Sequence, residues 1–192
     1  DSKEPKIKKT MPEKGFAGGD FDISFTEENP KSLNLTYGNI DTGFRSENVD
    51  LDVDCSDNGK GDWQCQVNEN LDDFDGQFIS YYFTLWDMGG HTIDSKEKTL
   101  KVDTENPVIE NVTYVVKGSS ATLSVQVDEE NIDFVNYINN DDPSPKDKKL
   151  CTKLVGGICK GNLKLNPGSN TINLQVSDKA GNSVGEIVEI IA

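Results

Sequence analysis

Apolar and polar residues alternate along most of this chain, and this two-residue period limits its fold more than any other feature. Phe21, Ile23 and Phe25 alternate with polar neighbours, and residues 78–86 do so over the longest stretch. Successive side chains of a β-strand point to opposite faces, so such runs predict strands with one buried face. Further runs of this kind lie at residues 33–37, 49–53, 112–114, 123–127, 134–138, 172–176 and 184–191. Turn signals separate them every 8–12 residues or so, and the sequence therefore predicts an all-β protein built of sandwiches.

A short polar link at residues 102–108 divides the chain just past its middle. Pro107 has a fixed φ and favours an extended conformation at Asn106. At roughly 100 residues per sandwich, the chain is long enough for two domains. We expect a flexible segment or an edge strand over 1–19, one sandwich over 20–103 and another over 104–192. The link is too short for a flexible coil, so we expect the flanking strands to run nearly end to end.

The two halves look like repeats, because four features occur in the same order in each. The matches are residues 28–30 with 105–107, residues 34–37 with 111–114, the two cysteine pairs, and residues 87–91 with 178–182. These matches predict that both halves follow one strand plan.

The composition excludes some classes of function. The net charge is −15, and an acidic surface disfavours nucleic acid, whose phosphates need Lys and Arg. No apolar run approaches the roughly 20 residues of a membrane span, and no signal peptide is recognisable. The chain looks like a piece of a mature ectodomain, with other domains of the same protein, or a cell-surface protein or glycan, as partners.

The four cysteines fall in two close pairs, Cys55 with Cys65 and Cys151 with Cys159. Neither pair has the spacing of a zinc knuckle or a redox motif. Disulfides within each pair are therefore predicted, and they indicate an oxidising, extracellular compartment. The alternative is four reduced, buried thiols, which the polar neighbours of these cysteines disfavour.

The sequence Asp-Lys-Ala-Gly-Asn at residues 178–182 resembles the turn before the last strand in Ig-like domains of bacterial and archaeal surface proteins. The sequence Val-Asp-Thr-Glu-Asn-Pro at 102–107 is similar to their interdomain junction. The resemblance spans residues 20–192 and implies two tandem Ig-like β-sandwiches from an array that acts as a stalk, an adhesin or a surface-layer component. The first domain departs from it at Gly89 and His91, and the cysteine loops are not part of the pattern.

Catalysis is not expected, because His91 is the one histidine and no Ser-His-Asp or Cys-His arrangement is available. No cofactor is required, but calcium takes oxygen ligands of the kind that cluster around the link. The candidate calcium ligands are Asp87, Asp103, Glu105, Asn106, Asp128 and Glu130. The alternative is that these acids and amides serve only the turns through side-chain hydrogen bonds.

Two other features suggest modification or binding. Asn34 and Asn111 each begin an Asn-X-Thr sequence, which is an N-glycosylation acceptor, at positions that the repeat makes equivalent. Trp63 lies inside the first cysteine loop, where it either anchors a protein or glycan partner or folds back onto the sheet.

Together these features predict a non-catalytic segment of a cell-surface protein, used as a rigid spacer or for adhesion or surface assembly. One alternative is a specific protein- or glycan-binding module whose tip is the Cys55–Cys65 loop. Another is a filament subunit that donates its N-terminal strand to a neighbour, and a hydrolase is the remaining possibility.

Overall fold

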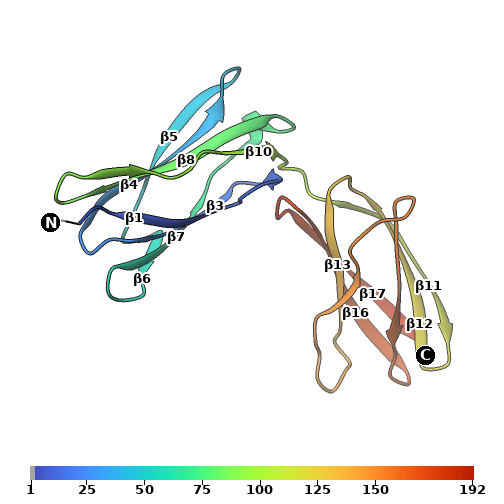
Figure 1. Ribbon diagram of the computed structural model, residues 1–192. Helices are drawn as coiled ribbons and strands as arrows, with labels where there is room; N and C mark the ends of the chain where they lie inside the picture. Colours follow the sequence, from blue (N-terminus) through green and yellow to red (C-terminus); the bar gives the residue numbers. More distant parts are fainter. Residues whose placement is uncertain (1–2) are drawn as a thin grey trace. The chain divides into compact units, whose positions relative to one another are not determined.

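The computed structural model describes residues 3–192, so the first two residues of the predicted N-terminal segment lie outside it. The chain divides into two compact units between Thr104 and Glu105. Each unit consists of two β-sheets packed face to face around its own core, and the described residues form no α-helix (Figure 1). The predicted fold class, two tandem β-sandwiches, is confirmed.

The first unit has a four-stranded and a six-stranded sheet. The four-stranded sheet has the order β1-β3-β7-β6, with β1 (Lys6–Met11), β3 (Asp20–Thr26), β7 (Asp62–Asn68) and β6 (Cys55–Asp57). The other has the order β2-β10-β8-β4-β5, with β2 (Phe16–Ala17), β10 (Lys98–Val102), β8 (Phe78–Asp87), β4 (Pro30–Asn39) and β5 (Gly43–Val49). The short β9 (Thr92–Asp94) also pairs with β8, and a single 3₁₀ turn, η1, spans Asp72–Phe74.

Aromatic side chains dominate the core of the first unit. Phe21 of β3 lies against Tyr37 of β4 and Tyr81 of β8, with ring centroids 6.1 and 4.8 Å apart. Phe74 of η1 meets Tyr37 edge-on, so the 3₁₀ turn closes one end of the sandwich. Burial raises the pKa of Tyr81 to about 12, and its hydroxyl donates to the Pro12 carbonyl at 2.7 Å.

The second unit has a three-stranded and a four-stranded sheet. The three-stranded sheet has the order β11-β12-β15, with β11 (Val108–Lys117), β12 (Ser120–Asp128) and β15 (Ile158–Lys164). The other has the order β14-β13-β16-β17, with β14 (Lys148–Cys151), β13 (Ile132–Asn139), β16 (Ser169–Asp178) and β17 (Ser183–Ile191). Its core is mostly aliphatic, and Tyr137 is the aromatic residue among its buried side chains.

Strand pairing shows which strands of the two units correspond. In each unit one strand lies between two partners in the first sheet, β3 between β1 and β7, and β12 between β11 and β15. In the second sheet, β4 and β8 occupy the places of β13 and β16. The first unit has three additional strands, β2, β6 and β9. The predicted common plan therefore holds for the central strands and not for every edge.

Two of the sequence matches that suggested the repeat are wrong. Residues 28–30 lead into β4, and residues 34–37 lie on it. Their supposed matches, residues 105–107 and 111–114, instead lead into and lie on β11, which is the counterpart of β1. The structural counterpart of Asn29 is Asn131. The backbone N–H of Met88 donates to the Asn29 carbonyl, and that of Lys179 donates to the Asn131 carbonyl, both at 3.0 Å.

The expected strand at residues 49–53 is also wrong, because β5 ends at Val49 and the chain then turns. Asp50 Oδ1 accepts from the backbone N–H of Asp52 at 3.0 Å and of Val53 at 3.3 Å, and Asp54 Oδ2 accepts from that of Asp50 at 2.9 Å. Carboxylates that bind nearby backbone N–H groups stabilise turns at the expense of strands. The alternation of acidic and apolar residues therefore gave a wrong prediction, because the aspartates form a turn with nearby backbone N–H groups.

At the N-terminus the structure has an edge strand, one of the two expected alternatives. Strand β1 pairs antiparallel with β3, from Lys6 opposite Thr26 to Met11 opposite Asp22. After Pro12 the chain crosses to the other sheet, where β2 runs parallel to β10. The N-terminal segment therefore contributes an edge strand to each sheet of the first unit.

Candidate functional site

An aspartate is buried in the same turn of each unit. Asp178 Oδ1 accepts from the backbone N–H groups of Ala180, Gly181 and Asn182 at 2.8–2.9 Å, and its Oδ2 accepts from Asn182 Nδ2 at 2.8 Å. Both Asp178 and its counterpart Asp87 are almost fully buried. Buried carboxylates need such partners, so these residues hold the turns closed.

In the first unit a histidine takes the place of the asparagine. Asp87 Oδ1 accepts from the backbone N–H of His91 at 2.8 Å, and Oδ2 lies 2.7 Å from His91 Nδ1. Burial raises the pKa of the Asp87 carboxyl, but hydrogen bonds from the His91 ring and backbone outweigh it, and the net pKa is lowered. His91 is therefore bound to a structural carboxylate.

The structure contains both expected disulfides, and they join different kinds of strand pair. Cys55 and Cys65 lie directly opposite each other on β6 and β7, which are neighbours in one sheet. Cys151 lies on β14 and Cys159 on β15, which belong to different sheets. The second disulfide therefore links the two layers of its sandwich, and the first stabilises one hairpin.

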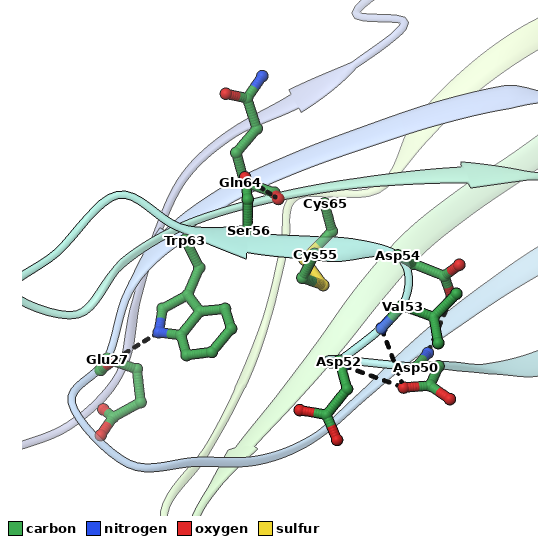
Figure 2. The surroundings of a disulfide bond; sticks show 10 residues. All are labelled: Glu27, Asp50, Asp52, Val53, Asp54, Cys55, Ser56, Trp63, Gln64 and Cys65. Atoms are coloured by element: carbon green, nitrogen blue, oxygen red, sulfur yellow. Dashed lines mark hydrogen bonds between the residues drawn. A yellow bond between two sulfur atoms is a disulfide. The ribbon is translucent and has the colours of Figure 1, made fainter.

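Trp63 folds back onto the sheet, which is the expected alternative to an exposed anchor, and a binding role for this residue stays a prediction. Its ring is stacked on Phe25 of β3 at 6.1 Å with an interplanar angle of 6°. Its Nε1 donates to the Glu27 carbonyl at 2.9 Å, and Figure 2 shows the indole turned toward Glu27 on the side of the Cys55–Cys65 disulfide. The side chain is half-buried against the core because stacking and the hydrogen bond satisfy both its apolar and its polar parts.

The candidate calcium ligands lie in unlike environments. In the first unit Asp87 is buried in its turn and Asp103 is half-buried just after β10. In the second unit Glu105, Asn106, Asp128 and Glu130 are all exposed. A pair that the sequence did not single out, Glu129 and Asp178, has carboxylate oxygens within 4.8 Å of each other. Two carboxylates supply too few of the six to eight oxygens that calcium takes, so calcium stays a prediction.

The two sequons are not equivalent in the fold. Asn34 lies on β4, between β8 and β5, opposite Thr84 on one side and Asn48 on the other. Asn111 lies on β11, an edge strand, opposite Gln126. The expectation of equivalent positions is therefore wrong, and the two acceptors have different neighbours.

Asn34 lies in the middle of a sheet face that has no charged side chain. Leu33, Leu35 and the odd-numbered residues 79–85 of β8 point into the core, so the residues between them point outward. We define the outer face as the outward residues of three neighbouring strands, namely Ser32, Asn34 and Thr36 of β4, Phe44, Ser46 and Asn48 of β5, and Phe78, Ser80, Tyr82, Thr84 and Trp86 of β8. Charged residues begin at its borders, with Asp94 on β9 and Lys101 on β10.

Every fourth residue of β8 on the outer face is aromatic: Phe78, Tyr82 and Trp86. Tyr82 lies opposite Thr36, whose hydroxyl donates to Ser46 at 3.4 Å, and Trp86 lies opposite Ser32. Hydrophobic periodicity did not single out this row, because it identifies the buried positions of a strand and not the outward ones. The signal was present in the alternate positions of the same run.

Comparisons with known proteins identify the fold. No family model matches the chain, and no curated protein matches it. The structure of the FN1-FN3 domains of chicken CNTN1 matches with a TM-score of 0.61 and 12% identity, over 98% of this chain and 68% of that one. A two-domain fibronectin type-III segment of chicken tenascin matches with a TM-score of 0.35 and 15% identity, over 98% of each chain.

The CNTN1 likeness shows that the chain has the fold of tandem fibronectin type III or Ig-like domains, and at this identity it shows the fold alone. Among residues 3–192, no helix has the length and apolarity to cross a membrane. The two disulfides are of a kind that persists in oxidising compartments.

Proposed function

We propose that this chain is a non-catalytic spacer or adhesion segment of an extracellular surface protein. The observation that supports this most directly is the closure of each unit by its own core and its own disulfide. A unit with its own core and its own disulfide resists unfolding without help from its neighbour, which suits a chain that bears load outside the cell. The resemblance of residues 178–182 and 102–107 to Ig-like domains of bacterial and archaeal surface proteins supports the same role.

Forced unfolding of the whole chain tests the role as a load-bearing spacer. Two separate unfolding events are expected, because the units have separate cores. Each disulfide shields a short loop from extension, with sequence separations of 10 and 8 residues. The Cα atoms joined by each disulfide are already 4.0 and 5.9 Å apart, so at roughly 3.3–3.6 Å per extended residue reduction should lengthen the two events by about 31 and 22 Å. Unfolding of either unit at forces too low to measure would contradict the proposal.

Binding through the Cys55–Cys65 loop is the weaker alternative. Trp63, the aromatic side chain of that loop, is stacked on Phe25 and bonded to Glu27. The contacts of Trp63 with its own unit therefore use one face of the ring and the indole N–H. The filament alternative needs an N-terminal strand that is free to be donated, whereas β1 pairs with β3 of its own unit.

Calcium is proposed only as an addition to this role. A melting curve with millimolar calcium and one with a chelator are the direct comparison, because a ligand that binds only the folded state raises its stability. Identical curves would remove calcium from the proposal and leave the spacer role intact.

A further inference from the structure

We propose that Asn34 is the acceptor of an N-linked oligosaccharide whose first sugars lie on the outer face against Tyr82 and Trp86. The proposal rests on the extracellular location proposed above. It begins from the position of Asn34, which is opposite Thr84 on the central strand β8. Tyr82 and Trp86 are its diagonal neighbours on the same face, at the separation of roughly 7–8 Å that aromatic side chains can bridge.

The chemistry of the outer face matches that of a neutral sugar. A sugar ring presents C–H groups on its faces and hydroxyls around its rim. The rings of Tyr82 and Trp86 offer apolar faces with a polar edge, and Ser32, Thr36 and Asn48 offer neutral hydrogen-bonding groups beside them.

The absence of charge argues against other macromolecules as the occupant. Charged residues make up 28% of the chain, yet the eleven positions of the outer face have none. The core of a protein interface is likewise poor in charge, but interfaces are enriched in Arg, and the outer face has none. A face of aromatic rings, hydroxyls and amides in a chain of net charge −15 favours an uncharged ligand.

Attachment precedes folding, when residues 34–36 are still accessible as an extended segment. The donor is an oligosaccharide linked to a lipid pyrophosphate. The amide nitrogen of Asn34 bonds to the anomeric carbon, the bond from that carbon to the phosphate oxygen breaks, the lipid pyrophosphate leaves with the electron pair, and the amide loses one proton. When β4 then pairs with β8, the sugar is brought over the aromatic row.

Asn111 provides a matched control within the same chain. It begins a sequon of the same type, but its cross-strand partner is Gln126, and Thr113 beyond it is opposite Ser124. A sugar on Asn111 would therefore have no aromatic row beneath it. The difference between the two glycans isolates the contribution of stacking from the general effect of glycosylation.

The experiment uses the full chain secreted by a eukaryotic host and, as reference, the same chain from a bacterial periplasm without N-glycosylation. Peptide mass spectrometry should find sugar on Asn34. In the Asn111→Gln variant, the glycan on Asn34 should raise the melting temperature of the first unit by about 2–6 °C, if stacking contributes as an aromatic pair does. In the Asn34→Gln variant, the glycan on Asn111 should change the melting temperature of the second unit by less than about 1 °C.

Substitutions in the aromatic row complete the test. Trp86→Ala should abolish the stabilisation by the Asn34 glycan, measured as the difference between glycosylated and unglycosylated forms of that variant. Tyr82→Thr, which keeps a good strand residue, should reduce it even if Trp86→Ala folds poorly. An unmodified Asn34, an equal effect of both glycans, or an effect that survives both substitutions would overturn the proposal. Any of these outcomes would leave the spacer role untouched, because the host secretes the chain whatever its role and so exposes Asn34 to glycosylation.

Discussion

In the first unit the disulfide joins neighbouring strands β6 and β7 of one sheet, whereas in the second it joins β14 and β15 of different sheets. The buried turn aspartates, Asp87 and Asp178, by contrast lie at the same point of each sandwich. The aromatic core of the first unit is crosslinked locally, and the aliphatic core of the second is crosslinked between layers. The difference indicates that the turns belong to the common frame and the crosslinks to each unit separately.

The largest expected effect concerns the turn aspartates. Asp178→Ala leaves three partly buried backbone N–H groups without their acceptor and should lower the free energy of unfolding of the second unit by about 3 kcal/mol. Asp87→Ala should destabilise the first unit less, because Asp87 is bound mainly by His91, which rotates toward water when released. Calorimetry reports both units. Tryptophan fluorescence reports the first alone, since Trp63 and Trp86 both lie there.

Equal losses of unfolding free energy from Asp87→Ala and Asp178→Ala would contradict this prediction and mean that the two turns stabilise their units equally. Asp178→Asn is the conservative control, because its side-chain oxygen can still accept from the same N–H groups. It should retain most of the stability that alanine loses.

Removal of each disulfide comes next in size. The loops have similar lengths, so a double Cys→Ser substitution of either pair should lower the free energy of unfolding of its own unit by about 2.5 kcal/mol. The local response should differ. Beyond the general increase that follows from lower stability, loss of Cys55–Cys65 should speed hydrogen exchange most in β6, whereas loss of Cys151–Cys159 should speed it most in both β14 and β15. A uniform increase across the first unit, with no excess in β6, would contradict the local role of its disulfide.

Trp63 gives a smaller effect, confined to the first unit. Trp63→Ala removes the stacking on Phe25 and the bond to the Glu27 carbonyl and should cost about 2 kcal/mol, below the range for fully buried aromatics. Trp63→Phe keeps an aromatic ring on Phe25 and should retain part of the stability that Trp63→Ala loses. Chemical denaturation monitored by the fluorescence of Trp86 measures both. Unchanged stability of Trp63→Ala together with lost partner binding would restore the binding-loop alternative.

The smallest effect is a dependence on pH in the first unit. The folded pKa of Asp87 lies below its ordinary value, so its stabilising effect is fully present above the unfolded pKa near 3.8 and is lost as pH falls through the folded pKa. His91→Asn installs the residue that the second unit has at Asn182, and at pH 7 it should change the stability by less than about 0.5 kcal/mol. Melting temperatures between pH 2 and 7, with and without this substitution, measure the contribution of the pair. A profile that is flat below pH 4 would contradict it.

The sequence predicted those parts of the fold in which one force decides the outcome. The buried faces of β3, β4, β8, β12 and β16 follow from their alternation, because burial of one face dominates the energetics of a half-buried strand. The disulfides followed from spacing and polarity. Residues 49–53 were mispredicted because Asp50 and Asp54 bind backbone N–H groups, an effect that hydrophobic periodicity does not include.

The candidate sites were less predictable because they depend on which strands become neighbours. The surroundings of Asn34 come from Thr84 and Asn48, which are 50 and 14 residues away in sequence. The burial of Trp63 depends on Phe25 across the sheet. Register between distant strands determines both, and similar short motifs such as residues 34–37 and 111–114 do not reveal it.

Strand β2 has no counterpart in the second unit, and the sheet edge that β2 covers in the first unit is open in the second. In the first unit β2 lies along β10, but β17, which takes the place of β10, ends its sheet with Ile187 and Ile191 exposed at 68 and 75%. Long edge strands with apolar side chains attract further strands, and charge is what keeps such molecules apart. The chain has a pI of about 4.4. Its colloidal stability should therefore be poorest in mildly acidic buffers, where net repulsion vanishes and the exposed isoleucines of β17 favour self-association.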